Sequence, residues 1–229
     1  MTESVEKKII ELNKLYNCDC MELMAQIPDK YFELAIVDPP YGGVTQGGYM
    51  KNSQSCNHLA KNHDYHTAIW NQKEPDLIFF DELKRVSKNQ IIWGGNYFTH
   101  MIHEPSQCWI VWDKKNGETH FADCELAYTS FDSASRIFRY KWQGMLQENM
   151  AHKEHKIHPT QKPVALYEWL LSKFAHKGDK ILDTHAGSAS SLVACHNMGF
   201  DFVGCEIDEE YYRLANERLQ AAQAQLTLF

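Results

Sequence analysis

Short apolar runs alternate with amphipathic stretches along most of the chain. The short runs predict strands, because each is bounded by turn residues or polar residues: 32–37, 90–93, 108–112, 180–182 and 202–205. Apolar stripes at helical spacing predict helices between them: 77–86, 162–175, 188–198 and 209–225, the last capped by Asp208. Two stretches with aromatic content, 124–130 and 136–142, predict antiparallel strands. This alternation is typical of an α/β fold.

Two polar stretches depart from the alternation. Residues 43–66 contain three glycines among many Asn, Ser and His residues, and residues 143–159 are rich in His and Lys. Loops of this length are usually either functional or disordered. No internal repeat is present, so we expect one domain over 1–229 with inserted segments at 43–66 and 136–159.

Composition excludes several protein classes. The chain of 229 residues is 44% hydrophobic and 23% charged, which is ordinary for a globular protein with a substantial core. No apolar run approaches the roughly 18 residues of a membrane helix, and the first residues lack a secretory signal, so we expect no membrane contact and a cytoplasmic location. Seven cysteines, an odd number, do not predict a disulfide framework. The net charge of −7 argues against a generally basic nucleic-acid binder.

The sequence Asp38-Pro39-Pro40-Tyr41 follows the predicted strand 32–37. Ligands of open α/β sheets bind at the edge where strands end. The two prolines stiffen the backbone, so the Pro39 carbonyl and the Asp38 carboxylate can accept both N–H bonds of one amino group, while Tyr41 can stack on a planar base. The motif therefore predicts a clamp for an aromatic amino group. The alternative is an acidic turn with a structural tyrosine.

Two more strand ends carry candidate binding residues. Residues 181–190 run from a strand through a turn of small residues into a helix, whose amino end favours an anionic group. The turn does not match the G-x-G-x-x-G fingerprint of dinucleotide sites. Glu206 ends the next strand about 20 residues later, where a carboxylate can bind ribose hydroxyls. The alternatives are an ordinary strand–helix turn and a solvated charge.

Together these motifs resemble those of the S-adenosylmethionine-dependent amino-methyltransferases of DNA, which modify adenine N6 or cytosine N4. Residues 38–41 are similar to that family's catalytic motif, and residues 183–190 resemble its cofactor motif. The segment 158–163 (HPTQKP) resembles the one that precedes the cofactor motif in the β-ordered subgroup. Residues 17–20, followed by Leu23 and Ile27-Pro28, and residues 110–114 are also similar to segments of that subgroup.

The resemblance implies a Rossmann-like, seven-stranded mixed sheet of the class I methyltransferase type, circularly permuted and with helices on both faces. It implies direct methyl transfer to a base flipped out of the duplex, with catalytic residues Asp38, Pro39, Pro40 and Tyr41. The cofactor would be S-adenosylmethionine. Its adenine would meet Asp19 and Cys20, its ribose Glu206, and its methionine part Asp183 and Gly187. The full cofactor-binding set implied is Asp19, Cys20, Asp38, Thr160, Lys162, Asp183, His185, Ala186, Gly187, Ser188, Glu206 and Ile207.

Three residues depart from the family pattern. His185 stands where the family usually has Phe, Ala189 replaces the second glycine of the cofactor motif, and Ser190 replaces its threonine. These departures concern the affinity for the cofactor. They leave the order of the motifs along the chain unchanged.

Double-stranded DNA requires a cationic track on this acidic protein. Residues 136–162 carry six basic side chains against two acidic ones, a net charge of +4. We expect residues 43–66 and 136–159 to contact DNA, the second through Arg136, Arg139, Lys141, Lys153 and Lys156; a solvated connection is the alternative. Histidines at 152, 155 and 158, and a Cys and His group within 56–66, have loose zinc spacing but no Cys-x-x-Cys anchor, so no metal is expected.

Several readings of the function stay open. Adenine N6 is favoured because the catalytic motif begins with aspartate rather than serine, and cytosine N4 is the first alternative. A catalytically silent module that binds nucleic acid or cofactor is a second, against which the intact residues 38–41 speak. RNA and a protein side-chain amide are further methyl acceptors. By analogy with the family, a homodimer would enlarge the DNA surface, and a companion restriction endonuclease is a further expected partner.

Overall fold

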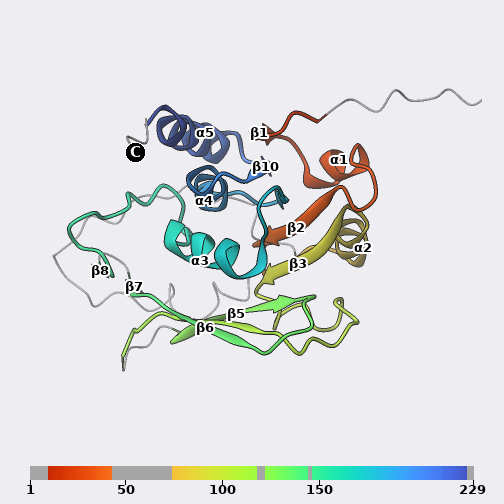
Figure 1. Ribbon diagram of the computed structural model, residues 1–229, viewed down its shortest axis with the longest axis horizontal. Coiled ribbons are helices and arrows are strands. Elements are labelled where there is room, and N and C mark those ends of the chain that lie inside the picture. The colour runs from red at the N-terminus through yellow and green to blue at the C-terminus, as the bar shows by residue number, and fades with distance from the viewer. Residues whose placement is uncertain (1–9, 43–73, 118–121, 144–145, 226–229) are drawn as a thin grey trace, which may run out of the picture.

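One mixed sheet of eight strands forms the centre of the computed structural model, which describes residues 10–42, 74–117, 122–143 and 146–225 (Figure 1). The order across the sheet is β1-β10-β9-β2-β3-β5-β4-β6. The strands are β1 (Lys14–Asn17), β2 (Phe32–Val37), β3 (Ser87–Trp93), β4 (Ile110–Asp113), β5 (Cys124–Thr129), β6 (Arg136–Arg139), β9 (Lys180–Asp183) and β10 (Asp201–Glu206). A separate hairpin joins β7 (Trp142–Gln143) to β8 (Leu146–Gln147).

Within this sheet, β5 alone runs opposite to the other strands. The five strands from β1 to β3 are parallel to one another, and β5 is antiparallel to both of its neighbours, β3 and β4. β9 and β10 come last in the sequence but lie between β1 and β2, as the predicted circular permutation requires. The α/β class of fold is confirmed.

Two expectations about this sheet are corrected. The resemblance implied seven strands, and the sheet has eight because β6 adds to the outer edge of β4. Residues 136–142 were predicted to form an antiparallel strand. β6 instead pairs in parallel with β4, from Ile110↔Arg136 to Asp113↔Arg139, and the strand ends at Arg139.

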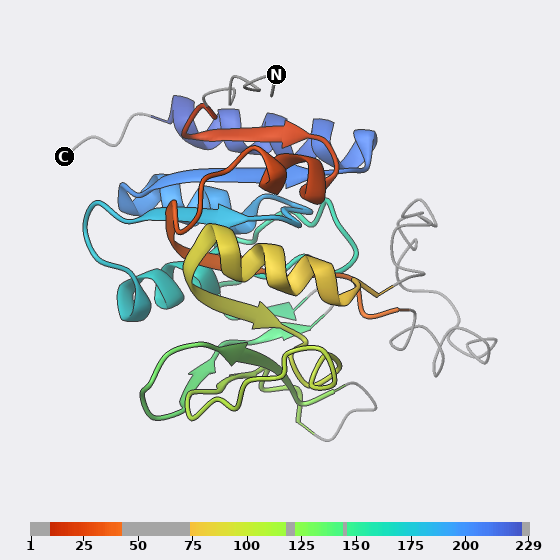
Figure 2. The same cartoon turned by 90° about the vertical axis from the view of Figure 1, so that its right-hand side faces the viewer.

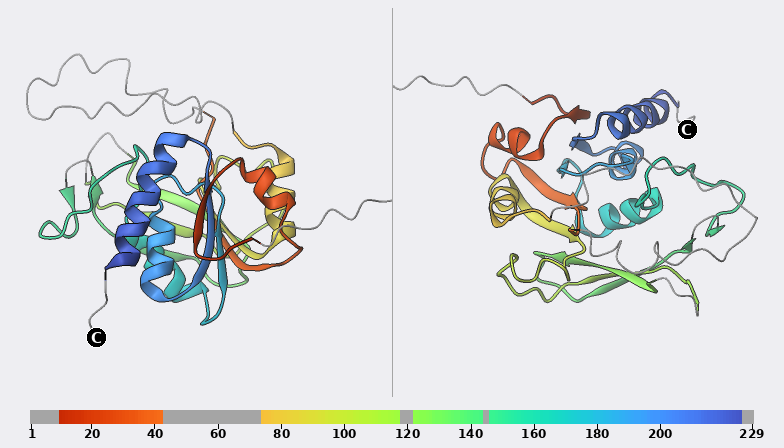
Figure 3. Two further views of the ribbon diagram at one scale, coloured as in Figure 1. Left: turned by 90° about the horizontal axis from the view of Figure 1, so that it is seen from above. Right: turned by 180° about the vertical axis from the view of Figure 1, so that it is seen from behind.

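Helices cover both faces of the sheet (Figures 1, 2 and 3). α1 (Cys20–Ala25) and α2 (Leu77–Val86) pack on one face, and α3 (Val164–Phe174), α4 (Ser190–Met198) and α5 (Glu209–Ala224) pack on the other. Alternate residues of β2 supply the two cores. Ala35 and Val37 join the cluster of α1 and α2, whereas Leu34 and Ile36 join that of α3 to α5.

Local sequence accounts for the best-predicted elements. β2 occupies 32–37 as predicted, because a central parallel strand is buried on both faces and reads as a continuous apolar run. α2 occupies 77–86, and the Asp76 side chain accepts a hydrogen bond from Phe79 N at its amino end. Asp208 caps α5 as predicted, accepting from Glu210 N and Tyr211 N at 3.0 Å each.

The topology brings four strand ends to one edge. β1, β10, β9 and β2 are adjacent and parallel, so the residues after them, Cys18, Ile207, Thr184 and Asp38, lie along that edge. In the part of the chain that the structure describes, no helix is long and apolar enough to cross a membrane. The predicted insertion 43–66 lies outside the described residues.

Candidate active site

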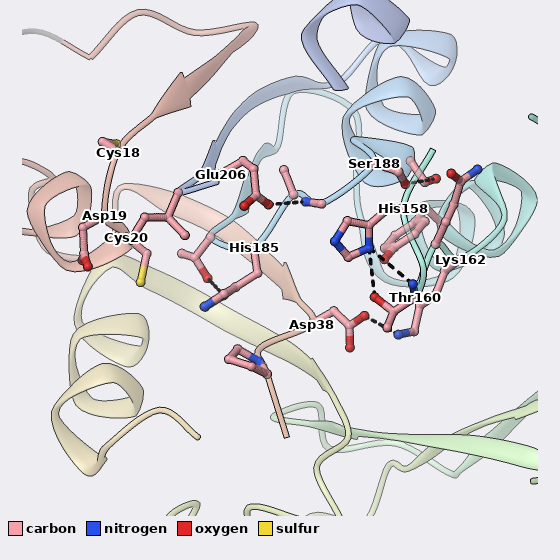
Figure 4. A pocket seen from close by; sticks show the side chains of 18 residues that line it. Cys18, Asp19, Cys20, Asp38, His158, Thr160, Lys162, His185, Ser188 and Glu206 are labelled. Carbon is pink, nitrogen blue, oxygen red and sulfur yellow. Dashed lines mark hydrogen bonds and ion pairs between the residues drawn. The ribbon is translucent and has the colours of Figure 1, made fainter. Parts of the chain in front are cut away.

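A cavity of about 240 Å³ lies at this edge of the sheet (Figure 4). Every residue predicted to bind the cofactor lines it except Asp183: Asp19, Cys20, Asp38, Thr160, Lys162, His185, Ala186, Gly187, Ser188, Glu206 and Ile207. Pro40 of the predicted catalytic motif also lines it. The sequence motifs therefore converge on one cavity, although they are spread from residue 19 to residue 207 of the chain.

Sequence reasoning missed six lining residues: Cys18, His158, Gln161, Tyr167, Thr184 and Ser190. Five of them lie inside motifs that the sequence analysis had marked, so neighbourhood in the sequence could have found them. Tyr167 gave no such signal. It is a buried residue of the α3 apolar stripe, and only the packing of α3 beside β2 brings it to the cavity.

Asp183 lies behind the lining rather than in it. It is 3% exposed and accepts hydrogen bonds from Ser191 Oγ and from His185 N, the latter at 2.9 Å. Burial raises the pKa of its carboxyl to about 7, although these hydrogen bonds oppose the shift. Asp183 thus shapes the turn after β9, which places the following residues around the cavity.

Glu206, the last residue of β10, holds the turn after β9 in place through hydrogen bonds to the backbone. Gly187 N donates to Glu206 Oε2 at 2.9 Å, and Asp208 N donates to Oε1 at 3.0 Å. Burial raises the pKa of Glu206, against the effect of these donors. Ala189, which stands at a glycine position of the family motif, has φ +58° and ψ +25°, and this left-handed conformation explains why glycine is usual there.

The segment after β1 forms another wall. Asp19 caps the short helix α1 by accepting from Met21 N at 2.7 Å. Asn17 Nδ2 donates to the backbone of Glu206 at 2.8 Å, which ties the end of β1 to the end of β10. Burial raises the pKa of the Cys20 thiol to about 12, so this thiol stays protonated at neutral pH.

His185 and His158 face the cavity as neutral imidazoles. Burial lowers the pKa of each to about 4, and the charge of Lys162 adds to the shift at His158. The His185 ring packs edge-on against Phe79 at 5.2 Å and 75°. His158 Nδ1 lies 3.1 Å from Thr160 Oγ1. Both rings therefore act here as uncharged, partly apolar surfaces.

We expect His185→Phe to stabilise the protein at acid pH. The folded-state pKa of about 4 lies below the unfolded value of about 6.5, so the unfolded chain binds the extra proton and stability falls as pH drops through this window. Phenylalanine removes this loss. Between pH 8 and pH 5, the difference in unfolding free energy between variant and wild type should shift by about 2 kcal/mol in favour of the variant.

Urea denaturation at pH 8 and pH 5 without ligand measures this shift. The matched control is His103→Phe, because His103 is an exposed histidine away from the cavity lining. A difference between the His185 variant and wild type that stays constant with pH would show that His185 is not buried as a neutral ring.

The catalytic motif is held by packing around Tyr41. Its hydroxyl donates to Asp38 Oδ1 at 2.6 Å, and burial together with the nearby Asp38 charge raises its pKa well above the ordinary value. Tyr97 stacks on the Tyr41 ring at 4.9 Å and 26°. A Cβ added to Gly94, whose φ is +67°, would come within 2.2 Å of the same ring. A base that stacks on Tyr41 therefore has to meet or replace Tyr97.

Lys162 belongs to the cofactor-binding set that the resemblance implied, and it lines the cavity. Its ammonium group, however, forms an ion pair with Asp38 Oδ2 and lies 3.2 Å from Glu125 Oε2. The predicted catalytic motif and the segment 158–163 are thus joined directly.

The basic residues predicted to contact DNA lie apart from the cavity lining. Arg136, Arg139 and Lys153 are exposed, and Lys141 is half-buried. Lys156 is also half-buried, with its ammonium 4.8 Å from the Trp142 ring. The described residues contain no cluster of His, Cys, Asp and Glu arranged to hold a metal. The Cys and His group within 56–66 lies outside them.

The chain is similar to known DNA methyltransferases in sequence and in fold. A family model described as DNA methylase, for N6 and N4 methyltransferases, matches residues 32–217. The type II methyltransferase M1.MboII of Moraxella bovis is 20% identical over 260 residues, covering 91% of this chain and 96% of that protein.

Two solved structures have the same fold. The M1.HpyAVI–SAM complex aligns with a TM-score of 0.56 at 19% identity, over 90% of this chain and 98% of that one. The cytosine-N4-specific PvuII DNA methyltransferase aligns with a TM-score of 0.57 at 12% identity, over 94% and 87%.

Proposed function

The chain belongs to the DNA methylase family, whose members use S-adenosylmethionine, and from that premise we propose that it methylates N6 of adenine in double-stranded DNA. The observation that carries the proposal is the position of Asp38-Pro39-Pro40-Tyr41 after β2, beside the cavity at the strand ends. The motif begins with aspartate rather than serine, which favours adenine over cytosine. Cytosine N4 is the alternative target, because it presents the same kind of amino group.

The residues around the cavity fit S-adenosylmethionine in their chemistry. Glu206 and Asp19 offer carboxylate oxygens on the side of β1 and β10, suited to hydroxyl and amino donors of the adenosine part. Thr160, Ser188 and Ser190 offer hydroxyl groups on the side of α3 and α4, suited to the amino-acid part. The cofactor supplies an electrophilic methyl group on a sulfonium.

The protein's own part in the reaction is positioning. Asp38 and the Pro39 carbonyl accept the two N–H bonds of the target amino group, so that its lone pair is directed at the methyl group. The Asp38 carboxylate also stabilises the positive charge that develops on nitrogen. The neutral His185 and His158 rings add no positive charge to the cavity surface. The proton released from nitrogen leaves to solvent.

The test uses tritiated S-adenosylmethionine and unmethylated duplex DNA, followed by digestion to nucleosides and mass spectrometry. Label in N6-methyladenine supports the proposal. Label in N4-methylcytosine overturns the adenine assignment and keeps the family's chemistry. Absence of label in DNA, with cofactor binding intact, overturns DNA as the methyl acceptor and directs the search to RNA or a protein amide.

We also propose that residues 136–159 bind the DNA backbone. The exposed side chains of Arg136, Arg139 and Lys153 belong to this segment, which is the most basic part of an acidic protein. Phosphate contacts release counterions, so such a track makes DNA affinity steeply dependent on salt. The segment 43–66, the homodimer and the companion endonuclease stay predictions.

Lys153→Glu is expected to weaken DNA binding roughly tenfold near 0.1 M salt and to reduce the slope of log K against log salt by about 1. Fluorescence anisotropy over a salt series measures both quantities. Lys173→Glu is the matched control, since Lys173 is an exposed lysine at the carboxyl end of α3, which leads to the opposite edge of the sheet. Equal effects of the two variants would contradict a localised DNA track.

A further inference from the structure

Lys162 is a buried cation at the centre of the site. Its side chain is 4% exposed, which is rare for lysine unless the charge is paired. The ammonium group contacts Asp38 Oδ2, lies 3.2 Å from Glu125 Oε2 and lies 5.3 Å from the centre of the Trp93 ring (Figure 4). The amino-acid part of a cofactor would have to compete with two carboxylates for this group.

The ion pair continues into the antiparallel part of the sheet. Glu125 belongs to β5, opposite Trp112 of β4, and its other oxygen pairs with Lys114, which follows β4. Although burial acts to raise the pKa of Glu125, Lys162 and Lys114 lower it to about 2. Burial likewise acts to lower the pKa of Lys162, but Asp38 and Glu125 raise it above its ordinary value. Glu125 and Lys162 are therefore both charged at neutral pH.

This chain of charges gives Asp38 fixed partners on both oxygens. Tyr41 donates to Oδ1 and Lys162 to Oδ2, so the carboxylate is held from two directions. Each oxygen keeps a further lone pair, which leaves an acceptor site for the target amino group. A carboxylate held in this way costs little reorganisation when positive charge develops beside it.

We propose that Lys162 is a positioning residue for methyl transfer, which holds and aims the Asp38 carboxylate, and that Glu125 in turn holds Lys162 in place. The inference rests on the proposed function, in which Asp38 receives the amino group. It assigns a catalytic purpose to β4 and β5, which contribute no residue to the cavity lining. It holds for adenine and for cytosine, because both targets present the same N–H donors.

Removing a cation beside a carboxylate favours protonation of that carboxylate, so loss of the Lys162 charge should narrow the acid range in which the enzyme works. The other titratable groups that act on this site are Tyr41, Tyr167, Asp183, Glu125 and His158. The pKa values of both tyrosines lie well above the working range. Asp183 titrates in both wild type and variant, but loss of the Lys162 charge also raises the pKa of His158, so the comparison is repeated in a His158→Phe background to isolate the effect on Asp38.

The experiment compares wild type, Lys162→Met and the double variant Lys162→Met/Glu125→Gln. Methionine keeps the length of the side chain without its charge. The single variant leaves Asp38 and Glu125 facing each other, and the double variant removes that repulsion, so it tests the idea even if the single variant folds poorly. The matched control is Lys180→Met, which removes a half-buried lysine that pairs with Glu33 and lies 4.8 Å from the centre of the Tyr31 ring, at the start of β9.

For both Lys162 variants, we expect kcat at saturating S-adenosylmethionine to fall at least 30-fold at neutral pH. The acid limb of the kcat profile should move up by about one pH unit or more, and the Kd for S-adenosylmethionine by calorimetry should stay within about threefold of wild type. Lys180→Met should match wild type in all three quantities. Wild-type activity, to either base, is measured first and tests the proposed function separately.

Two results would overturn the inference. A tenfold weaker Kd with unchanged kcat would make Lys162 a cofactor ligand. A lower kcat with an unchanged acid limb of the pH profile would show that Lys162 only forms a structural ion pair. If wild type transfers no methyl group, the proposed function fails, and the inference about catalytic positioning falls with it.

Discussion

A protein carrying Asp38→Asn is expected to transfer methyl groups at least about 100-fold more slowly than wild type while still binding S-adenosylmethionine. Asparagine keeps the shape of the side chain but replaces one acceptor oxygen with a donor and removes the negative charge. In the wild type, Lys162 and Tyr41 both donate hydrogen bonds to the Asp38 carboxylate. In the variant, the single amide oxygen cannot accept from both of them and from the target amino group.

Asparagine is a better test than alanine at this position. Asp38→Ala would leave the buried ammonium of Lys162 with Glu125 as its carboxylate partner, so a lost activity would combine a chemical effect with a folding defect. The matched control is Asp201→Asn, because Asp201 begins β10 at the opposite edge of the sheet. Among the described contacts, its side chain accepts one hydrogen bond, from the exposed Asn13 side chain.

Single-turnover methyl transfer at saturating cofactor, with calorimetry for binding, separates the two effects. Asp201→Asn should retain the wild-type rate. A rate for Asp38→Asn within threefold of wild type would show that an ionised acceptor is not needed, and the assignment of Asp38 as the amino-group clamp would be wrong.

The sequence alone was enough to predict elements that are determined by their own residues and the residues beside them. β2 and α2 have the predicted bounds, because a continuous apolar run makes a buried central strand and because Asp76 caps an amphipathic stripe. Most of the cavity lining was also found from the sequence, since the ends of adjacent parallel strands must meet at one edge.

Elements that depend on partners far away in the sequence were not predicted correctly. β1 (KLYN) has no apolar run of its own and is a strand because it pairs with β10, nearly 190 residues later. β6 was assigned the wrong direction because its partner is β4 rather than the strand before it in the chain. Lys162 and Asp38 are 124 residues apart in the sequence, and no local sequence pattern indicates a buried ion pair between residues so far apart.

The second large effect is expected in stability, at Arg218 and Glu154. Arg218 Nη2 donates to Glu154 Oε2 at 2.7 Å, and Nη1 donates to Ser188 O at 2.8 Å and to Ser190 Oγ at 2.9 Å. Glu154 Oε1 accepts from Val164 N at the start of α3. The pair therefore ties residues 146–159 to α3, α5 and the turn that lines the cavity.

Burial opposes both charges of this pair. It raises the pKa of Glu154, against the effect of Arg218, and it lowers the pKa of Arg218, against the effect of Glu154. Such a pair contributes little net stability over a neutral one, yet removing one partner leaves an uncompensated buried charge. We therefore expect Arg218→Met to lower the free energy of unfolding by about 3 kcal/mol at pH 7.

The double variant Arg218→Met/Glu154→Gln should be more stable than Arg218→Met alone. Glutamine removes the stranded charge and keeps an oxygen for Val164 N. Urea denaturation of the three proteins without ligand measures the differences, and Arg213→Met is the matched control, because its ion pair with Glu217 is more than half exposed on both sides. S-adenosylmethionine should bind both Arg218 variants more weakly, since Ser188 and Ser190 lose their anchor. A double variant less stable than the single one would mean that the ion pair itself, rather than the avoidance of an unpaired charge, holds this segment against the cavity.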